Sequence, residues 1–331
     1  MTSNNTQQKT TTILVVGGAG YIGSVMVEQL YAQGYQVVVV DNLSTGHRDA
    51  VDRRITFYEH SCGDEDKMGR VFTEHSIDVV MHFAAFSLVS ESVDQPEKYF
   101  KNNIAETIHL LAVMRECGCG KFILSSTAAI FGEPHYTPID ERHVKNPLNP
   151  YGLSKWTLEN ILHWYHVSYH LRYNSFRYFN AAGASVQYGE RHDPETHIIP
   201  LLLQAAHRET EFTLYGTDYD TPDGTCIRDY IHVLDLADAH IKGIKNLDEH
   251  PAGCYNLGNG KGFSNKEVIE TVKNVTRKDF SVLNGARRPG DPAILVASSE
   301  KAQEELGWQP VYTELKDIVA SAYRFYKGRG C

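Results

Sequence analysis

The chain has 331 residues and a formal net charge of −9, and its 42% apolar and 22% charged residues are typical of a globular protein. This length predicts two domains, or one large domain with an addition. The acidic balance argues against nucleic acid or an anionic membrane as a partner, because both require clustered Lys and Arg. No apolar run approaches the length of about 18 residues that crosses a membrane, and the polar N-terminus does not resemble a signal peptide.

Six cysteines are spread along the chain, and none belongs to a CxxC motif. Without a signal peptide we expect them to be free thiols, and we expect the protein to be cytoplasmic. Sixteen histidines raise the question of a metal site. No HxxxH pair includes a glutamate; His166 and His170 have this spacing, but on an aromatic-rich helix. We therefore expect surface or interface histidines and no metal.

The first half of the chain alternates between short apolar runs and helical patterns. Residues 13–17 form an apolar run that stops at glycines, 21–33 repeat apolar side chains at helical spacing, and 37–40 are four valines. Strand, turn, helix and strand within about 30 residues make a βαβ unit. The elements predicted after it are strands over 77–85, 121–126 and 173–181, and helices over roughly 97–117 and 150–170.

These strand candidates are continuous apolar runs, which indicates a parallel sheet covered by helices on both faces. The predicted fold class is α/β, a doubly wound parallel Rossmann sheet with a smaller mixed α/β domain. After about residue 182 the strands shorten, as at 212–216 and 254–258, and Gly, Asp and Pro become frequent. We expect this smaller domain to lie over the carboxyl edge of the sheet, where open α/β folds bind ligands.

The domain limits follow from this change of pattern. The dinucleotide-binding domain is expected over 11–181, and a strand and helix within about 229–250 are expected to return to its sheet. The substrate domain is expected over 182–228 and 251–331. The two domains would thus be interleaved.

A glycine-rich turn, VVGGAGYIGS at 15–24, follows the first strand and opens the first helix. Gly17, Gly20 and Gly23 permit the tight turn and the close approach of a pyrophosphate. The helix N-terminus then offers N–H groups and a positive dipole end to the phosphates. Asp41 ends the next strand, where a carboxylate accepts hydrogen bonds from the ribose and repels a 2′-phosphate. The sequence therefore predicts NAD rather than NADP; a tight turn without a ligand is the alternative.

Tyr151 and Lys155 stand four positions apart behind Pro150, at the predicted start of a helix. Residues at this spacing share one helix face. A phenol titrates near pH 10 when unperturbed. A cationic lysine one turn away, with a positive nicotinamide ring, is expected to bring this pKa toward neutral. The phenolate could then take a proton from a sugar or alcohol hydroxyl as hydride leaves the same carbon. An ordinary solvated Tyr/Lys pair is the alternative.

Several stretches resemble one known family. GGAGYIG, HFAA, SST and YGLSK are similar to the motifs of extended short-chain dehydrogenases/reductases. The longer stretches 177–184, 222–240 and 286–293 resemble the UDP-sugar 4-epimerases of that family. The resemblance runs from residue 13 to the WQP at 308–310. It implies reversible interconversion of UDP-galactose and UDP-glucose by transient oxidation at C4, with tightly bound NAD.

The resemblance also implies an assembly. In the family, two helices matching those near 97–117 and 151–170 form a four-helix bundle in a homodimer. Apolar and aromatic residues lie on more than one side of these helices, namely Leu110, Val113, Leu162, Trp164, Tyr165 and Tyr169. A thick monomeric core is the alternative.

The family's site residues carry over position by position. Tyr151 matches the catalytic base, Lys155 the lysine that also holds the nicotinamide ribose, and Thr127 a serine or threonine that hydrogen-bonds the reacting sugar hydroxyl. The residues matched to the UDP-sugar, besides Thr127 and Tyr151, are Asn180, His197, Ile198, Tyr215, Arg228, Arg288, Asp291 and Leu295. The residues matched to NAD, besides Tyr151 and Lys155, are Gly17, Gly20, Tyr21, Ile22, Gly23, Asp41, Asn42, Leu43, Ser44, Thr45, Gly46, Ser61, Phe83, Ala84, Ala85, Ser87, Asn102, Ser125, Tyr178 and Phe179.

Within the UDP-sugar set, the resemblance implies separate roles. Arg228 and Arg288 would bind the diphosphate, a task that suits guanidinium groups because their contacts to phosphate are bidentate. Surface salt bridges are the alternative for both. Asp291 would contact the uridine ribose, and Tyr215 would lie against the uracil.

The chain departs from the family pattern at five positions. Thr127 replaces the more common serine, and its hydroxyl can form the same hydrogen bond. Ser87 stands where some members carry a lysine on the cofactor, and His197 where several have asparagine. The usual acid directly after the third strand is missing, and Ser61 stands at the adenine position, which leaves that contact open. Leu295 is intermediate in size at the position that admits or excludes a 2-N-acetyl group. Acceptance of UDP-GlcNAc and UDP-GalNAc, like that of UDP-pentoses, therefore stays open.

Other functions share this fold. Sugar-nucleotide 4,6-dehydratases need an acid pair after the threonine of the fourth strand, where this chain has Ala128 and Ala129. Decarboxylating relatives and UDP-glucuronate epimerases need extra cations for a 6-carboxylate, and the sequence offers no clear candidate. NAD-sensing regulatory proteins often lose the tyrosine or the lysine, whereas this chain keeps both.

Overall fold

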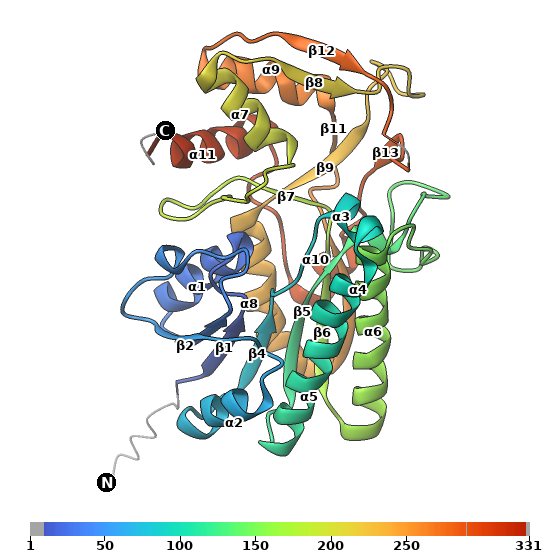
Figure 1. The fold of residues 1–331 in the computed structure, drawn as a ribbon. Coiled ribbons are helices and arrows are strands. Elements are labelled where there is room, and N and C mark those ends of the chain that lie inside the picture. Colours follow the sequence, from blue (N-terminus) through green and yellow to red (C-terminus); the bar gives the residue numbers. More distant parts are fainter. Residues whose placement is uncertain (1–9, 289, 329–331) are drawn as a thin grey trace, which may run out of the picture.

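A computed structural model describes residues 10–288 and 290–328. A large parallel sheet with helices on both faces forms the first part of the molecule. A smaller part with short strands and its own helices lies at one end of that sheet (Figure 1). Among the described residues, no helix is both long enough and apolar enough to span a membrane.

The large sheet has seven strands in the order β10-β6-β5-β4-β1-β2-β3, and all neighbours are parallel. The strands are β1 (Thr12–Val16), β2 (Gln36–Asp41), β3 (Thr56–Glu59), β4 (Val79–His82), β5 (Lys121–Thr127), β6 (Arg172–Tyr178) and β10 (Ala252–Leu257). After β3 the chain crosses back and continues with β4 on the other side of β1. This reversal opens a crevice at the carboxyl ends of the strands, which is where such sheets bind ligands. The predicted doubly wound α/β fold is confirmed.

Alternate residues of the central strands pack against opposite helical layers. Ile13 and Val15 face one layer, which contains α1 (Tyr21–Ala32) and α8 (Val233–Glu249). Leu14 and Val16 face the other layer, made of α2 (Glu65–Glu74), α5 (Glu106–Glu116) and α6 (Pro150–Tyr169). Both faces are buried, which explains why the strand sequences are apolar throughout rather than alternating.

The helix predicted over 97–117 is one helical stretch of mixed type. After α3 (Val89–Asp94), it begins with α4 (Pro96–Tyr99), passes through a π-helical segment, Phe100–Ala105, and continues as α5. Asn103 in that segment is buried, and its amide bonds both the N–H and the carbonyl of Phe86 at 3.0 Å. A π-segment changes the phase of a helix, and such segments are frequent at functional sites.

The smaller part has its own core. Its helices are α7 (Ile198–Arg208), α9 (Asn265–Thr276) and α11 (Leu315–Gly328). Its larger sheet is mixed: β9 (Ile227–His232) pairs with β11 (Gly262–Ser264), β13 (Ile294–Leu295) and β7 (Asn180–Ala182). A second sheet joins β8 (Phe212–Tyr215) to β12 (Val282–Gly285). Elsewhere in the described chain there are two short helical turns, Arg48–Ala50 and Ala128–Ile130, and a short helix, α10 (Glu300–Leu306).

Three segments differ from the sequence prediction. The strand predicted at the start of 230–240 does not return to the large sheet, because β9 is the centre of the small one; only α8 returns. The run at 254–258, expected in the second domain, belongs to β10 at the edge of the large sheet, where Tyr255 and Leu257 pack under α8. The strand predicted over 173–181 also divides at Phe179, and its two halves, β6 and β7, enter different sheets.

Candidate active site

A cavity of about 460 Å³ lies at the carboxyl edge of the large sheet, beneath the smaller part. Its walls come from the glycine turn after β1, from the ends of β2, β4, β5 and β6, and from the start of α6. Residues of the smaller part, including Arg228 and Asp291, close it from the other side. This is the crevice that the strand order predicts.

The glycine turn is built so that only glycine fits at two of its positions. Gly17 has a φ of +79°, and a Cβ there would lie 2.4 Å from the backbone nitrogen of Ala84. A Cβ at Gly23 would lie 2.1 Å from the carbonyl oxygen of Gly17. Gly20, by contrast, precedes α1 without a side-chain cap, and a Cβ there would meet only the Gly17 oxygen, at 3.5 Å. The helix N-terminus therefore keeps open space beside the cavity, and a pyrophosphate fits there.

Asp41 ends β2 and is held rigidly by the neighbouring backbone. Its Oδ2 accepts a hydrogen bond of 2.9 Å from the N–H of Ala19, and its Oδ1 accepts one of 2.8 Å from Leu43. Burial raises the pKa of this carboxyl, while the two backbone hydrogen bonds lower it. The side chain lies on the cavity wall beyond the glycine turn, where it can accept hydrogen bonds from a ribose.

Tyr151 and Lys155 both line the cavity from the first two turns of α6. The helix starts where Asn149 caps it, since the Asn149 side chain accepts the N–H of Gly152 at 2.8 Å. Lys155 is only 1% exposed, and its Nζ donates a hydrogen bond of 2.7 Å to the carbonyl oxygen of Ser125. Burial lowers the pKa of Lys155 to about 7.

The side chains of the protein do not by themselves lower the pKa of Tyr151. Burial raises the pKa of its hydroxyl, and the Thr127 hydroxyl, which hydrogen-bonds it, acts in the opposite direction. The largest effect is therefore desolvation, not attraction to Lys155, whose ammonium group bonds a backbone carbonyl instead. In this arrangement the tyrosine keeps its proton and must be activated by positive charge that enters the cavity.

The smaller part contributes a guanidinium group to the cavity. The Arg228 side chain is 13% exposed, and its Nη2 lies 3.6 Å from Oδ1 of Asp291. Asn180 lines the cavity from β7, and its amide donates to the carbonyl of Asp229 at 3.0 Å. This end of the cavity therefore suits an anion joined to a polar group.

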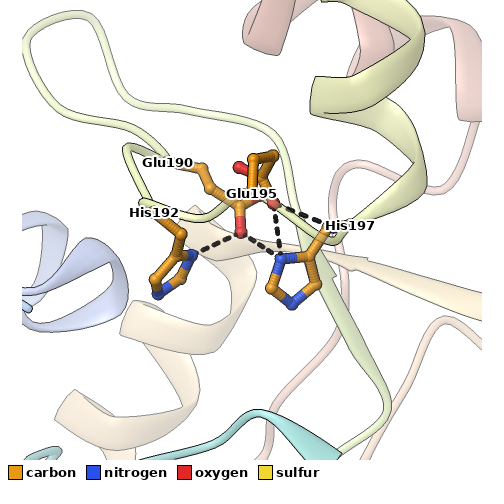
Figure 2. Close-up of side chains that lie close together, drawn as sticks. All are labelled: Glu190, His192, Glu195 and His197. Carbon is orange, nitrogen blue, oxygen red and sulfur yellow. Dashed lines mark hydrogen bonds and ion pairs between the residues drawn. The ribbon is translucent and has the colours of Figure 1, made fainter. Parts of the chain in front are cut away.

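Four further side chains converge at the cavity wall, in the segment between β7 and α7 (Figure 2). We call Glu190, His192, Glu195 and His197 the His/Glu cluster. Nδ1 of His197 lies 2.7 Å from Glu190 and 2.9 Å from Glu195, and Nδ1 of His192 lies 2.8 Å from the same Glu190 oxygen. Desolvation alone would lower the pKa of His197, but the two carboxylates outweigh it and raise this pKa. The His197 side chain is still 47% exposed, so its ring remains accessible from the cavity.

The chain matches one family model, that of the NAD dependent epimerase/dehydratase family, over residues 13–258. The chain belongs to this family. The matched region contains the whole glycine turn, Asp41, and the Tyr151/Lys155 pair.

Several proteins similar to this chain are UDP-glucose 4-epimerases. A UDP-glucose 4-epimerase of Lacticaseibacillus casei is 49% identical over 320 residues, which cover 96% of this chain and 97% of the relative. A UDP-glucose 4-epimerase from Brucella ovis, solved in complex with NAD, is 44% identical with a TM-score of 0.91, covering 95% of this chain and 98% of the other. One from Bifidobacterium longum, in complex with NAD⁺ and UDP, is 37% identical with a TM-score of 0.91, covering 97% and 99%.

Most of the residues that the family resemblance selected lie together on the cavity wall. They are Gly17, Gly20, Tyr21, Ile22, Gly23, Asp41, Asn42, Ser44, Thr45, Ser61, Phe83, Ala84, Ala85, Ser87, Asn102, Ser125, Thr127, Tyr151, Lys155, Tyr178, Phe179, Asn180, His197, Arg228, Asp291 and Leu295. Five of the selected residues do not line it. Leu43 packs on the core, Gly46 packs on Ala19, and Ile198 packs in the core of the smaller part. Arg288 lies with its guanidinium carbon 4.3 Å from the centre of the Tyr215 ring, outside the cavity wall.

The sequence reading missed several cavity residues. Glu106, at the start of α5, lines the cavity and accepts a hydrogen bond from the Ser61 hydroxyl. Glu190 and His192 also line it. The four residues of the His/Glu cluster follow the spacing Glu-x-His-x-x-Glu-x-His in the sequence. This spacing could have indicated the cluster, but it is neither helical nor a familiar metal motif.

Proposed function

We propose that this protein is a UDP-glucose 4-epimerase that interconverts UDP-galactose and UDP-glucose with tightly bound NAD. The observation that carries this proposal is the position of Tyr151 and Lys155, which share one cavity with the glycine turn and with Arg228. The identity of 49% over 96% of the chain to a UDP-glucose 4-epimerase supports the choice of substrate.

The dinucleotide fits the first part of the cavity. The open side of Gly20 and the N-terminus of α1 would hold the pyrophosphate, and Asp41 the adenosine ribose. Lys155 would hold the nicotinamide ribose from the base of the cavity. NAD supplies a hydride acceptor and donor for the sugar carbon and a positive charge beside the phenol.

The residues of the chain move the proton. Tyr151 is the group that takes the proton of the sugar 4-hydroxyl and later returns it, and Thr127 orients both hydroxyls through its own. Lys155, with a pKa of about 7, can lose or gain a proton at neutral pH and so supports the change of charge on the phenol. Each group ends the cycle in the state in which it began, so the reaction is redox-neutral.

The substrate would be held mainly by its UDP. Arg228 is the guanidinium group on the cavity wall, and it matches the diphosphate-binding arginine of the family. If the diphosphate is held firmly and the sugar only loosely, the 4-keto sugar ring can rotate within the cavity. Hydride can then return to the opposite face of C4. Arg288 and Tyr215 stack on each other outside the wall, and we propose that Tyr215 lies against the uracil and that Arg288 reaches the diphosphate from there.

Two features bear on competing functions. Ala128 and Ala129 line the cavity directly after Thr127, at the place where a dehydratase needs an acid and a base. Their methyl groups supply neither, which supports epimerisation. Leu295 is half-buried on the cavity wall, and the same NMR assay with UDP-GlcNAc would show whether it admits a 2-N-acetyl group.

We also propose a homodimer formed through α5 and α6. The expected apolar residues Leu110, Val113 and Leu162 are buried against the sheet, but Trp164 and Tyr169 are 64% and 51% exposed. Exposed aromatic side chains on one helix suit a partner surface. The described cysteines are all free thiols, which agrees with the cytoplasm as the place of action.

Proton NMR of the purified protein with UDP-galactose and no added cofactor tests the proposal. We expect UDP-glucose signals to grow to a fixed ratio, which would show both epimerisation and NAD carried through purification. A 6-deoxy-4-keto product would instead identify a dehydratase. An unchanged spectrum, even after NAD is added, would reject the substrate, and UDP-GlcNAc and UDP-pentoses would then be assayed in the same way.

A further inference from the structure

We propose that the His/Glu cluster binds one divalent transition-metal ion, with Zn²⁺ as the best match, at the junction of the two domains (Figure 2). The cluster offers two imidazole nitrogens and two carboxylate oxygens, and one ligand atom from each residue lies within 4.8 Å of all the others. The site is separate from the proton and hydride chemistry of Tyr151.

The donor atoms match a zinc site in kind, and they lie close enough together to reach one ion. Zinc takes four nitrogen, oxygen or sulfur ligands at about 2.0–2.2 Å, so neighbouring ligand atoms of a tetrahedral site lie about 3.4 Å apart. The nitrogen–oxygen separations around Glu190 and His197 are 2.7–2.9 Å. These three contacts would lengthen around a bound ion, and all four ligand atoms, which lie within 4.8 Å of one another, would converge on it. A mixed nitrogen and oxygen set favours such an ion over Mg²⁺ or Ca²⁺, which prefer oxygen alone.

The charge in the cluster also favours a divalent ion. The side chains of Glu190 and Glu195 are only 8% and 7% exposed, and both carboxylates contact the same imidazole nitrogen of His197. Two buried carboxylates side by side are costly unless positive charge balances them. One proton on His197 balances one of them, whereas a divalent ion balances both.

The segment that carries the cluster is fixed by outer contacts, as metal ligands usually are. Oε1 of Glu195 accepts the backbone N–H groups of Thr196 and His197, each at 2.8 Å. Between the first two cluster residues, Arg191 forms an ion pair of 2.8 Å with Asp49 of the dinucleotide-binding part. An ion in the cluster would therefore hold the segment before α7 in place, and the Arg191–Asp49 ion pair connects this segment to the NAD-binding half of the cavity.

Coordination through Nδ1 would also fix the tautomer of His197. Nε2 would then carry the proton, and Figure 2 shows that this nitrogen points away from the two glutamates. Because His197 lines the cavity, the Nε2–H group could donate to an anionic substrate group there. The ion would thus position a binding residue rather than take part in the reaction.

Metal content and metal-dependent stability test this site. The NAD-containing protein, purified without a histidine tag, is analysed by inductively coupled plasma mass spectrometry and by thermal melting before and after chelation. We expect about one zinc per chain, a lower Tm after chelation and its recovery with Zn²⁺. Glu190→Gln and His192→Asn should each lose at least nine-tenths of the zinc and the response of Tm to it. The matched control, Glu249→Gln with His250→Asn on the exposed end of α8, should keep both.

Two outcomes would overturn the proposal. If the wild-type protein holds no zinc above background and added Zn²⁺, Mn²⁺ and Co²⁺ leave its Tm unchanged, the cluster is a hydrogen-bonded ion-pair network only. If zinc is bound but both variants bind it as the wild type does, the ion lies elsewhere. X-ray absorption of the zinc-bound protein should show nitrogen and oxygen ligands only, at about 2.0–2.2 Å, and sulfur ligands would also contradict the site.

A second inference comes from the carboxyl end of β3, and it rests on NAD being the cofactor. The geometry points to Glu106 as the carboxylate that binds the adenine amino group, in place of the acid missing after β3. The Ser61 hydroxyl donates to Glu106, and both side chains line the cavity. β3 is the neighbour of β2, so this pair lies one strand beyond Asp41, in the direction that adenine extends from its ribose.

Gly63 shows that the local backbone is fitted to this glutamate. A Cβ at Gly63 would lie 2.9 Å from Cβ and 3.0 Å from Oε2 of Glu106, and the Gly63 N–H donates to the Ser61 hydroxyl oxygen at 3.0 Å. Gly63 thus leaves room for the Glu106 side chain, and the Ser61 hydroxyl connects the two residues by hydrogen bonds. Adenine offers an exocyclic N–H₂ donor, for which a carboxylate is the appropriate acceptor.

Retention of NAD, rather than activity, tests the role of Glu106. The rate at which bound NAD is released on dilution is compared for wild type, Glu106→Gln and Glu116→Gln, an exposed glutamate of the same helix. Loss of a hydrogen bond to a charged group should speed release about tenfold or more in Glu106→Gln, with no change in Glu116→Gln. The double variant Ser61→Asp with Glu106→Ala should restore retention. Release from Glu106→Gln at the wild-type rate would overturn this role, whereas a wild type that never binds NAD would reject the proposed function itself.

Discussion

The ammonium nitrogen of Lys155 donates a hydrogen bond of 2.7 Å to the carbonyl oxygen of Ser125. This contact joins the second turn of α6 to the end of β5, one helical turn from Tyr151. The lysine is 1% exposed, and burial lowers its pKa to about 7. A buried lysine is costly for folding, so we attribute its presence here to its function in the cavity.

Replacement of Lys155 by methionine should therefore separate stability from activity. The folded protein releases the Lys155 proton near pH 7 and the unfolded chain near pH 10.5, so the unfolded chain binds more protons between these values. This lysine then makes stability rise with pH in that window, by up to about 1.4 kcal/mol per pH unit. In Lys155→Met this increment should vanish, and epimerase activity should fall by about 10² or more.

Urea unfolding of the NAD-free protein at pH 7, 8 and 9 measures this increment. Lys101→Met, at an exposed position of the π-helical segment, is the control and should keep the wild-type pH dependence. Equal pH dependence in wild type and Lys155→Met would show that the lysine is not deprotonated at neutral pH.

Removal of the Tyr151 hydroxyl should abolish proton transfer without emptying the cofactor site. Tyr151→Phe keeps the ring in the cavity wall but has no group that can exchange a proton with the 4-hydroxyl. We expect kcat to fall by about 10² to 10⁴, while the NAD content measured after denaturation stays at the wild-type value. Tyr136→Phe, at a position 46% exposed, is the control. Near-normal turnover in Tyr151→Phe would reject the assignment of the base.

The large sheet and the glycine turn could be predicted because their signals are local. Apolar runs such as residues 37–40 define strands by themselves, and the spacing of Gly17, Gly20 and Gly23 defines the turn. The placement of β9 and β10 could not be predicted, because their short runs are alike and the choice of sheet is made by pairing with distant strands.

The missed site residues have a similar explanation. Glu106 follows a π-helical segment, which changes the helical phase, so a regular helical pattern does not show which way this side chain points. The His/Glu cluster lies mainly in a loop, where no periodicity indicates which residues meet. Burial of Tyr151 could not be predicted either, because spacing along a helix gives proximity but not desolvation.

Acid should destabilise the protein through its buried histidines. Burial lowers the pKa of His82 to about 3 and that of His240 to about 4, and both side chains are almost fully buried. Between these values and pH 6.5 the unfolded chain binds more protons than the folded one. Each histidine therefore contributes stability above pH 6.5 that is lost as the pH falls, by about 1.4 kcal/mol per pH unit.

Urea unfolding at pH 7.0, 6.0, 5.0 and 4.5 tests this expectation. His82→Gln should lose stability with falling pH less steeply than wild type, by the increment of one proton. His250→Asn, at an exposed position, should follow the wild type. Parallel curves for wild type and His82→Gln would mean that His82 takes up no proton on unfolding in this range.

The buried ion pair between Glu159 and Arg177 should be sensitive to loss of one partner. Nη2 of Arg177 lies 2.6 Å from Oε2 of Glu159, and the two side chains are 3% and 2% exposed. Glu159→Leu leaves an unpaired buried guanidinium and should cost about 3–5 kcal/mol of unfolding free energy. The double variant with Arg177→Met should recover most of this loss, because it removes both charges.

Asp238→Asn is the matched control for that pair. It breaks the surface pair of Asp238 with Lys242, whose side chains are 44% and 35% exposed, and should cost about 1 kcal/mol or less. Denaturant unfolding of all variants gives the comparison. A double variant as unstable as Glu159→Leu would show that the loss comes from packing rather than from an uncompensated charge.

The proposed dimer depends on an exposed apolar surface of α5 and α6. Leu153, Trp164 and Val167 are 42%, 64% and 52% exposed at heptad-like spacing along α6, and Ile108 on α5 is 37% exposed. A charge in the middle of this surface would be buried without a partner in the dimer. Trp164→Glu should therefore give a monomer of 37.2 kDa by light scattering, whereas the wild type should have twice this mass. Val311→Glu, at a 78% exposed position of the smaller part, should remain dimeric. A monomeric wild type would mean that this apolar surface serves another partner, because its exposure would otherwise be unfavourable in water.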